Sequence, residues 1–182
     1  MIKRILIIML GVIVGIILLV CAFFATLNYV FKNPPIPPDQ SMIEHFNQHK
    51  TVFDDLVTMS NQDFHVIRIA NNFTRLVNNW NWPRPESELG FSMNRWNEYR
   101  ALFKEIDCGY GIDRSEEDGS IFITAYASGM VTGGVYKGYA FLTSPPERVV
   151  SSLDESKTSA KSNEYTYKKI IGNWYLFYSW DD

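Results

Sequence analysis

An uninterrupted apolar run near the start divides the chain into two parts of different character. Residues 5–27 carry no charge, and these 23 residues would form an α-helix about 34 Å long, enough to cross a hydrocarbon core of about 30 Å. Lys3 and Arg4 precede the run and only Lys32 follows it closely. Basic residues favour the cytoplasmic side. The pattern therefore predicts a single-pass signal-anchor over residues 1–27, in the inner (plasma) membrane, with a cytoplasmic N-terminus and a periplasmic or extracellular domain.

Three fates of this N-terminal segment stay open. An uncleaved anchor is favoured because the run is longer than the apolar core of a signal peptide, which has about 7–15 residues. Small residues around Val20 would also allow cleavage after Ala22. Lipid attachment at Cys21 is disfavoured, because Val20 occupies the position where a lipoprotein signal needs a smaller residue.

Gly11 and Gly15 form a GxxxG pair within the run. Such pairs let two membrane helices approach closely. They make a homodimer through this helix a candidate arrangement, although glycine is also common in membrane helices that do not pair.

A proline-rich segment follows the apolar run. Residues 28–40 contain four prolines within 34–38, which favour an extended polyproline-type conformation. We expect this segment to act as a spacer between the membrane and a domain over residues 41–182.

In the first half of that domain, two stretches have hydrophobic residues at helical spacing. Apolar residues recur every three or four positions between about 40 and 60, so a helix is expected to start at Asp39 or Ser41. Ser41 with Glu44 fits a capping box. A second helix is expected after Ser92, with Gly109 as a suitable end.

The period then changes to two, which is typical of strands. Residues 65–70 form a first, short candidate, and a tight hairpin is expected at Gly172–Asn173. Together these patterns predict an α+β domain of about two helices packed on an antiparallel sheet of four to five strands. The four clearest strands are 120–128, 135–143, 165–171 and 174–180.

Charge and cysteine content exclude several classes of protein. Residues 36–182 carry 14 basic and 20 acidic side chains, a formal charge of −6. Because nucleic-acid binding needs clustered Lys and Arg, we expect no nucleic-acid partner. Cys21 and Cys108 lie in different parts of the chain, so no disulfide is expected between them.

Few residues carry recognisable catalytic or metal chemistry. His45 and His49 are spaced to share a metal on a helix, but no third ligand is evident and Phe46 stands where the zincin pattern needs Glu. The glycines near Lys137 fit a hairpin turn better than a phosphate loop. His65 is the one candidate for a hydrolytic site assembled in space. We therefore assign no catalytic residue, metal or cofactor, and the protein leans toward a non-enzyme.

The most unusual local cluster combines Trp80, Trp82 and Arg84 beside two prolines. Tryptophan and arginine are the residue types enriched at interface hot spots. This loop is the candidate binding site, and the alternative is that the tryptophans cover the core.

Four stretches of the domain resemble a group of uncharacterised bacterial envelope proteins that are anchored in the membrane and have no assigned function. The resemblance extends over much of residues 36–180 and implies a bacterial envelope location, without implying any functional residue. The stretches are 82–90, 95–103, 129–140 and 173–178.

These observations favour one hypothesis of function over two others. The first is a non-enzymatic single-pass membrane protein whose extracytoplasmic domain binds another envelope component, either a protein or part of the cell wall. The second is an accessory subunit of a membrane complex that acts through its transmembrane helix. The third, less favoured, is an envelope hydrolase around His65.

Overall fold

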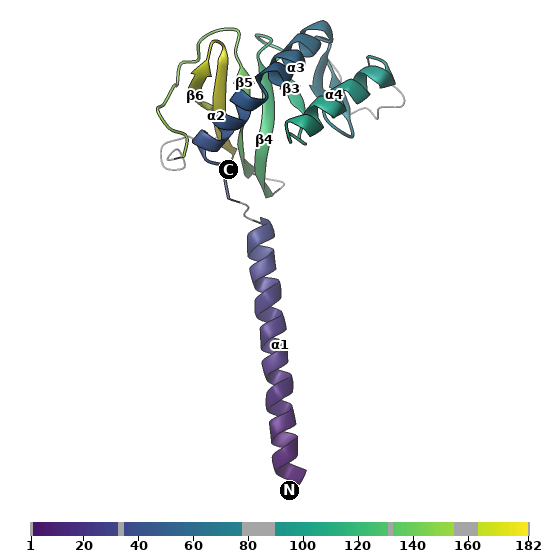
Figure 1. Ribbon diagram of the computed structural model, residues 1–182, viewed down its shortest axis with the longest axis vertical. Helices are drawn as coiled ribbons and strands as arrows, with labels where there is room; N and C mark the ends of the chain where they lie inside the picture. The colour runs from purple at the N-terminus through teal and green to yellow at the C-terminus, as the bar shows by residue number, and fades with distance from the viewer. Residues whose placement is uncertain (1, 33–34, 78–89, 131–132, 155–163, 182) are drawn as a thin grey trace. The chain divides into compact units, whose positions relative to one another are not determined.

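Figure 1 shows the computed structural model of the chain, which describes residues 2–32, 35–77, 90–130, 133–154 and 164–181. The chain divides into two compact units, Met1–Pro35 and Ile36–Asp182.

The first unit consists of helix α1 (Ile2–Lys32). It continues five residues past Leu27, into the segment that the sequence predicts to be a spacer. The large apolar side chains between Val12 and Phe24 are 47–72% exposed. Among the described residues, no helix combines the length and the apolar character that crossing a membrane requires.

The second unit is built on one antiparallel sheet, in the order β2-β1-β3-β4-β5-β7-β6. Most neighbours in the sheet are neighbours in sequence, and the two exceptions are the pairing of β1 with β3 and that of β5 with β7. The strands are β1 (Val66–Ile69), β2 (Thr74–Leu76), β3 (Ile112–Arg114), β4 (Ile121–Met130), β5 (Gly133–Phe141), β6 (Thr166–Ile171) and β7 (Trp174–Asp181).

Three helices cover one face of this sheet: α2 (Asp39–Gln48), α3 (Lys50–Gln62) and α4 (Met93–Glu105) (Figure 1). Their apolar stripes and the inward residues of the strands form a single core, because each element buries only one face. We call this covered side the inner face and the opposite side the outer face. Prominent core residues are Phe46, Phe53, Leu56, Trp96, Phe103, Ile69, Ile112, Ile123, Tyr139 and Leu176.

The α+β class and the antiparallel pairing are confirmed, but the element counts are wrong. The sheet has seven strands rather than four to five, and three helices lie in this unit rather than two. The two strands missed outright, β2 and β3, are three residues long, too short for alternation to identify. The strand expected at 65–70 is present as β1, and the four strands expected after residue 120 are β4 to β7.

The single helix expected over 40–60 is interrupted at His49, where φ is −115° and ψ is 19°. Phe46 on α2 and Phe53 on α3 both pack against Tyr139, with ring centroids 6.1 and 4.6 Å away. Residues seven apart drift by about 20° on a straight helix. Both rings thus lie over the same strand, one on each side of the interruption.

The predicted capping box at Ser41 and Glu44 is wrong. Helix α2 begins two residues earlier, at Asp39, behind Pro38 in polyproline geometry. The Ser41 hydroxyl donates to the Pro38 carbonyl at 2.8 Å instead of accepting from the backbone. In contrast, the predicted cap of α4 is confirmed, because Ser92 Oγ accepts from the backbone N–H of Arg95 at 3.2 Å.

Candidate functional site

The sequence-predicted binding loop cannot be placed, because Trp80, Trp82 and Arg84 lie outside the described residues. Gly11 and Gly15 lie on α1 with no atom within 4 Å of the position that a Cβ would occupy. The glycine face of the helix is therefore open in this single copy of the chain.

The histidines contact backbone carbonyl groups. His45 Nε2 donates to the carbonyl of Ile106 at 2.9 Å, and His65 Nε2 donates to the carbonyl of Gly90 at 2.6 Å. The rings of His45 and His49 lie 4.7 Å apart. Within the described ranges, no group of three His, Cys, Asp or Glu side chains is placed to hold a metal ion.

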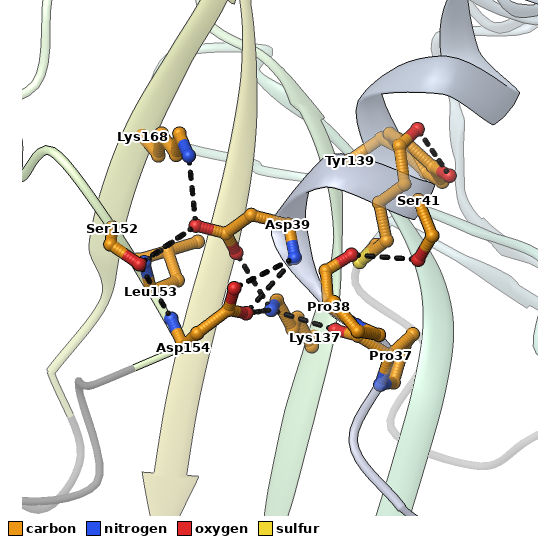
Figure 2. Close-up of polar contacts among 11 residues, drawn as sticks. Pro37, Pro38, Asp39, Ser41, Lys137, Tyr139, Ser152, Leu153, Asp154 and Lys168 are labelled. Carbon is orange, nitrogen blue, oxygen red and sulfur yellow. Dashed lines mark hydrogen bonds and ion pairs between the residues drawn. The ribbon is translucent and has the colours of Figure 1, made fainter.

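A cluster of buried charges, which the sequence did not predict, joins the start of the domain to the sheet (Figure 2). Lys137 on β5 is fully buried, and its Nζ lies 2.7 Å from Asp39 Oδ1 and 2.8 Å from Asp154 Oδ1. The same ammonium donates to the Pro37 carbonyl at 2.8 Å. Two hydrogen bonds and one ion pair therefore engage this ammonium.

The Asp39 carboxylate accepts its hydrogen bonds at Oδ2, whereas Oδ1 is buried in the ion pair with Lys137. Its Oδ2 accepts from the Leu153 backbone N–H at 2.8 Å and from Lys168 Nζ at 3.0 Å. Burial alone would raise the pKa of Asp39, but hydrogen bonds from Lys137, Leu153 and Lys168 outweigh it and hold the pKa below its ordinary value of 3.8. The backbone N–H of Asp39 in turn donates to Asp154 Oδ1 at 2.9 Å.

We call Asp39, Lys137, Asp154 and Lys168 the charge lock. Its central ammonium has no exposed surface, so a ligand cannot reach it without opening the fold. Its role is structural: it fixes residues 37–39 to β5, β6 and the 152–154 loop.

The outer face holds a groove of about 620 Å³ between β1–β3 and β4–β7. Directly paired residues place Arg75, Arg68, Asp113 and Phe122 in one row across β2, β1, β3 and β4. A second row places Thr124, Gly138 and Phe177 across β4, β5 and β7. The remaining lining residues are Arg114, Ser115, Tyr136, Tyr165 and Ser179. Gly138 lies in the second row, between Thr124 and Phe177.

One wall of the groove is charged. Arg68 Nη1 lies 2.7 Å from Asp113 Oδ2, and both side chains are about one-quarter exposed (26% and 27%). Burial raises the pKa of Asp113 above its ordinary value, although the Arg68 and Arg75 guanidinium groups act in the opposite direction. Arg114 borders the groove at the end of β3, but it is paired with the core residue Ile121 and its Nη1 donates to Asn61 Oδ1 on α3 at 2.8 Å, on the inner side of the sheet.

The opposite wall is aromatic. The ring of Tyr165 lies 5.2 Å from that of Phe122 and 5.7 Å from that of Phe177, centroid to centroid. Phe177 is buried, whereas Tyr165 and Tyr136 are 47% and 39% exposed. Thr124 and Ser179 add buried hydroxyl groups to the lining. The groove thus presents guanidinium groups, aromatic rings and hydroxyl groups together, and we take it as the candidate binding site.

The sequence contains part of the signal for this groove. Alternation in the strands after residue 120 predicts that Phe122 and Thr124 lie on the same face of one strand. It likewise assigns Phe177 to one face of another strand. The charged wall comes from β1, β2 and β3, and two of these strands are too short to recognise. The pairing of Arg68 with Asp113 joins residues 45 positions apart, which local spacing does not reveal.

Comparison with protein-family models, curated proteins and solved structures gives no match for this chain.

Proposed function

We propose that this protein is a single-pass membrane protein of the bacterial envelope whose extracytoplasmic domain binds another envelope component in the groove of the outer face. The observation that carries the proposal is the composition of the groove. Arginine, tyrosine and phenylalanine converge there around a concavity, and these residue types dominate binding sites and interface hot spots.

The anchor rests on the charge-free run at 5–27 and on the basic residues that precede it. The exposed apolar side chains along residues 12–24 support it, because such a surface on a helix is costly in water. The resemblance to bacterial envelope proteins supports the same location. The loop of Trp80, Trp82 and Arg84 stays a second candidate contact surface under this proposal.

The charge lock fixes the first residues of the second unit to its sheet. Asp39 and the carbonyl of Pro37 are bound to the same ammonium, that of Lys137. This lysine is on β5, next to Tyr136, which lines the groove. A pull on the chain that precedes Pro37 would therefore act on the sheet that carries the groove.

The test compares two matched double variants of the full-length, C-terminally tagged chain in crosslinked membranes. Arg68→Gln with Tyr165→Ser removes a cation and an aromatic ring from the groove. Lys104→Gln with Phe64→Ser removes the same groups from exposed positions elsewhere; Phe64 is 65% exposed. We expect the component captured by the parent to be lost from the first variant and kept by the second. Equal capture by both folded variants would contradict the proposal.

The accessory-subunit function is the second candidate, favoured by the open glycine face of α1. Replacing both Gly11 and Gly15 with isoleucine would then disrupt assembly, whereas Val12→Ile with Ile16→Val would not. If assembly is unchanged in the glycine variant, association does not depend on this face.

A further inference from the structure

We propose that the groove of the outer face binds an uncharged, linear oligosaccharide. This inference rests on the proposed function and adds the chemical class of the ligand. It commits to a neutral glycan; a charged glycan and an extended peptide are outcomes of the test.

The charges that line the groove are compensated within the protein. Arg68 Nη1 lies 2.7 Å from Asp113 Oδ2, and the guanidinium group of Arg75 acts on the same carboxylate. The Arg114 guanidinium donates to Asn61 on the inner side of the sheet. A charged ligand would have to compete with a closed ion pair, and removing its own charge from water costs free energy. The charged wall therefore favours a ligand that carries no net charge.

The same ion pair can still hydrogen-bond to a neutral ligand. A guanidinium group has five N–H donors and an ionised carboxylate has about four acceptor sites, and the Arg68 and Asp113 side chains are 26% and 27% exposed. Sugar hydroxyl groups both donate and accept, so neighbouring hydroxyls of one sugar match the donor and the acceptor side of the pair. The hydroxyl groups of Thr124 and Ser179 extend this polar lining.

The aromatic wall accounts for the apolar face of a sugar ring. Tyr165 is 47% exposed, and its ring lies 5.2 Å from Phe122, 5.7 Å from Phe177 and 6.1 Å from Tyr167, centroid to centroid. These neighbours restrain its orientation. A rigid ring with an apolar body and a polar tip covers the C–H face of a pyranose at little cost in conformational entropy.

The combination of an aromatic ring and a closed ion pair recurs in an adjoining hollow of about 710 Å³. Tyr165 lines both hollows, and Tyr167 lies beside it in the second. There Arg148 Nη1 is 3.3 Å from Glu164 Oε2, and the exposed carboxylate of Glu147 disfavours an anion. Both volumes lie within the range of about 300–1,000 Å³ that is usual for small-ligand sites. Two adjoining hollows of similar composition fit a ligand with repeating units.

The position of the groove within the sheet disfavours an extended peptide. Its floor is formed by β4, β5 and β7, and each of these strands is paired on both sides. A peptide that adds to a sheet as a further strand needs a free edge. The floor offers side chains instead of unpaired backbone groups, and this is the kind of surface on which a sugar lies.

The experiment titrates the full-length protein calorimetrically, in a detergent without a sugar headgroup. Chitotetraose and cellotetraose are the neutral probes. Tetragalacturonic acid and tetraglucosamine are the anionic and cationic probes of the same length, glucose is the single unit, and a proline-rich decapeptide represents a peptide. We expect at least one neutral tetrasaccharide to bind at least ~10-fold more tightly than every other probe. Its affinity should be the same in about 50 and 500 mM salt, because no net charge is neutralised.

Variants then assign the binding to the groove. Tyr165→Ala should weaken the neutral tetrasaccharide about tenfold, the effect of truncating a hot-spot side chain. Tyr165→Phe keeps the ring and should stay within about threefold of the parent. Tyr110→Ala is the matched control, because Tyr110 is 44% exposed and lines neither hollow. Thermal unfolding checks that each variant is folded.

The proposal is overturned if a charged tetramer or the peptide binds as tightly as the neutral tetrasaccharides, if Tyr165→Ala binds unchanged, or if no saccharide binds. In the last case, component capture that still depends on Arg68 and Tyr165 would leave the groove as a binding site for a protein. Capture that does not depend on these side chains would contradict the proposed function instead.

Discussion

The ammonium of Lys137 and the carboxylate of Asp39 form a buried ion pair with an N–O distance of 2.7 Å, and neither side chain is more than 2% exposed. The pair joins β5 to the first residue of α2. A buried charge is costly unless it is paired and hydrogen-bonded, and both partners here have several additional hydrogen bonds. Residues 37–39, which the sequence assigns to the spacer over residues 28–40, are therefore an integral part of the second unit.

Removing the lysine charge should strongly destabilise the domain. Lys137→Met keeps much of the side-chain volume but removes the buried cation between Asp39 and Asp154, so that Asp39 keeps only the more exposed Lys168 as a partner cation. We expect a loss of about 3–5 kcal/mol in the free energy of unfolding, the usual effect of breaking a buried pair. Urea denaturation followed by tryptophan fluorescence measures it.

Two controls separate this effect from the general loss of a lysine. Lys104→Met, on the exposed last turn of α4, should change stability by no more than about 0.5 kcal/mol. Lys137→Met combined with Asp39→Asn should cost less than the sum of the single changes, because the second change removes an uncompensated charge. Additive costs would show that the two residues do not interact.

The charge lock also predicts a dependence of stability on acid. The pKa of Asp39 is lower in the folded chain than its ordinary value of 3.8, so the ionised carboxylate stabilises the fold fully above that pH. This contribution is lost as pH falls below 3.8, through the lower pKa of the folded state. We expect the free energy of unfolding to fall in this window when it is measured between pH 6 and pH 2.

Asp39→Asn should be less stable than the parent at neutral pH and should lose less stability in acid. Hydrogen bonds also lower the pKa of Asp118 against the effect of its burial, so the variant should retain part of the acid dependence. An unchanged slope below pH 3.8 in Asp39→Asn would mean that this carboxylate does not carry the effect.

Gly138 should not tolerate a side chain. A Cβ at this position would lie 2.2 Å from the carbonyl oxygen of Ile123 and 2.8 Å from Cε1 of Phe177. Gly138→Ala should therefore push β4 from β5 and displace Phe177 from the groove, costing about 1–3 kcal/mol or more. Gly109→Ala, whose Cβ would meet its nearest neighbour at 3.9 Å, is the matched control in thermal unfolding. Similar melting temperatures for the two variants would be evidence against this packing.

Cys108 should react very slowly in the folded protein. Burial and the neighbouring Asp107 raise the pKa of its thiol to about 12, and the side chain is 1% exposed. At pH 8 we expect alkylation to be at least roughly 1,000-fold slower than that of a free thiol, whose pKa is about 8.5. Mass spectrometry of the Cys21→Ser chain treated with iodoacetamide measures this rate. Fast labelling without denaturant would contradict the burial of Cys108.

The sequence predicts long, regular helices and strands. It does not predict very short strands or contacts between residues that are far apart in the chain. The period-two pattern of 174–180 corresponds to β7, and the cap at Ser92 corresponds to α4, because each signal is local. The break at His49 depends on packing of Phe46 and Phe53 against Tyr139 on a remote strand. No local pattern contains that information.

The same limit applies to the candidate site. Lys137 stood out only as a lysine among turn glycines, and its partner Asp39 lies 98 positions earlier. Arg68 and Asp113 meet across two short strands, and only the sheet order brings them beside Phe122 and Tyr165. Clusters contiguous in sequence, such as Trp80 to Arg84, were the ones that spacing could identify, and that cluster lies outside the described residues.

The most direct test of the central claim, that the outer-face groove binds an envelope component, is site-specific photo-crosslinking in living cells. A photoreactive amino acid replaces Tyr136 at the rim of the groove or Thr51 on the exposed side of α3, in otherwise identical full-length chains. We expect a discrete crosslinked species from position 136 that disappears when Arg68→Gln and Tyr165→Ser are added, and none of that species from position 51. Equal crosslinking from both positions, or crosslinking at 136 that survives the added changes, would contradict it.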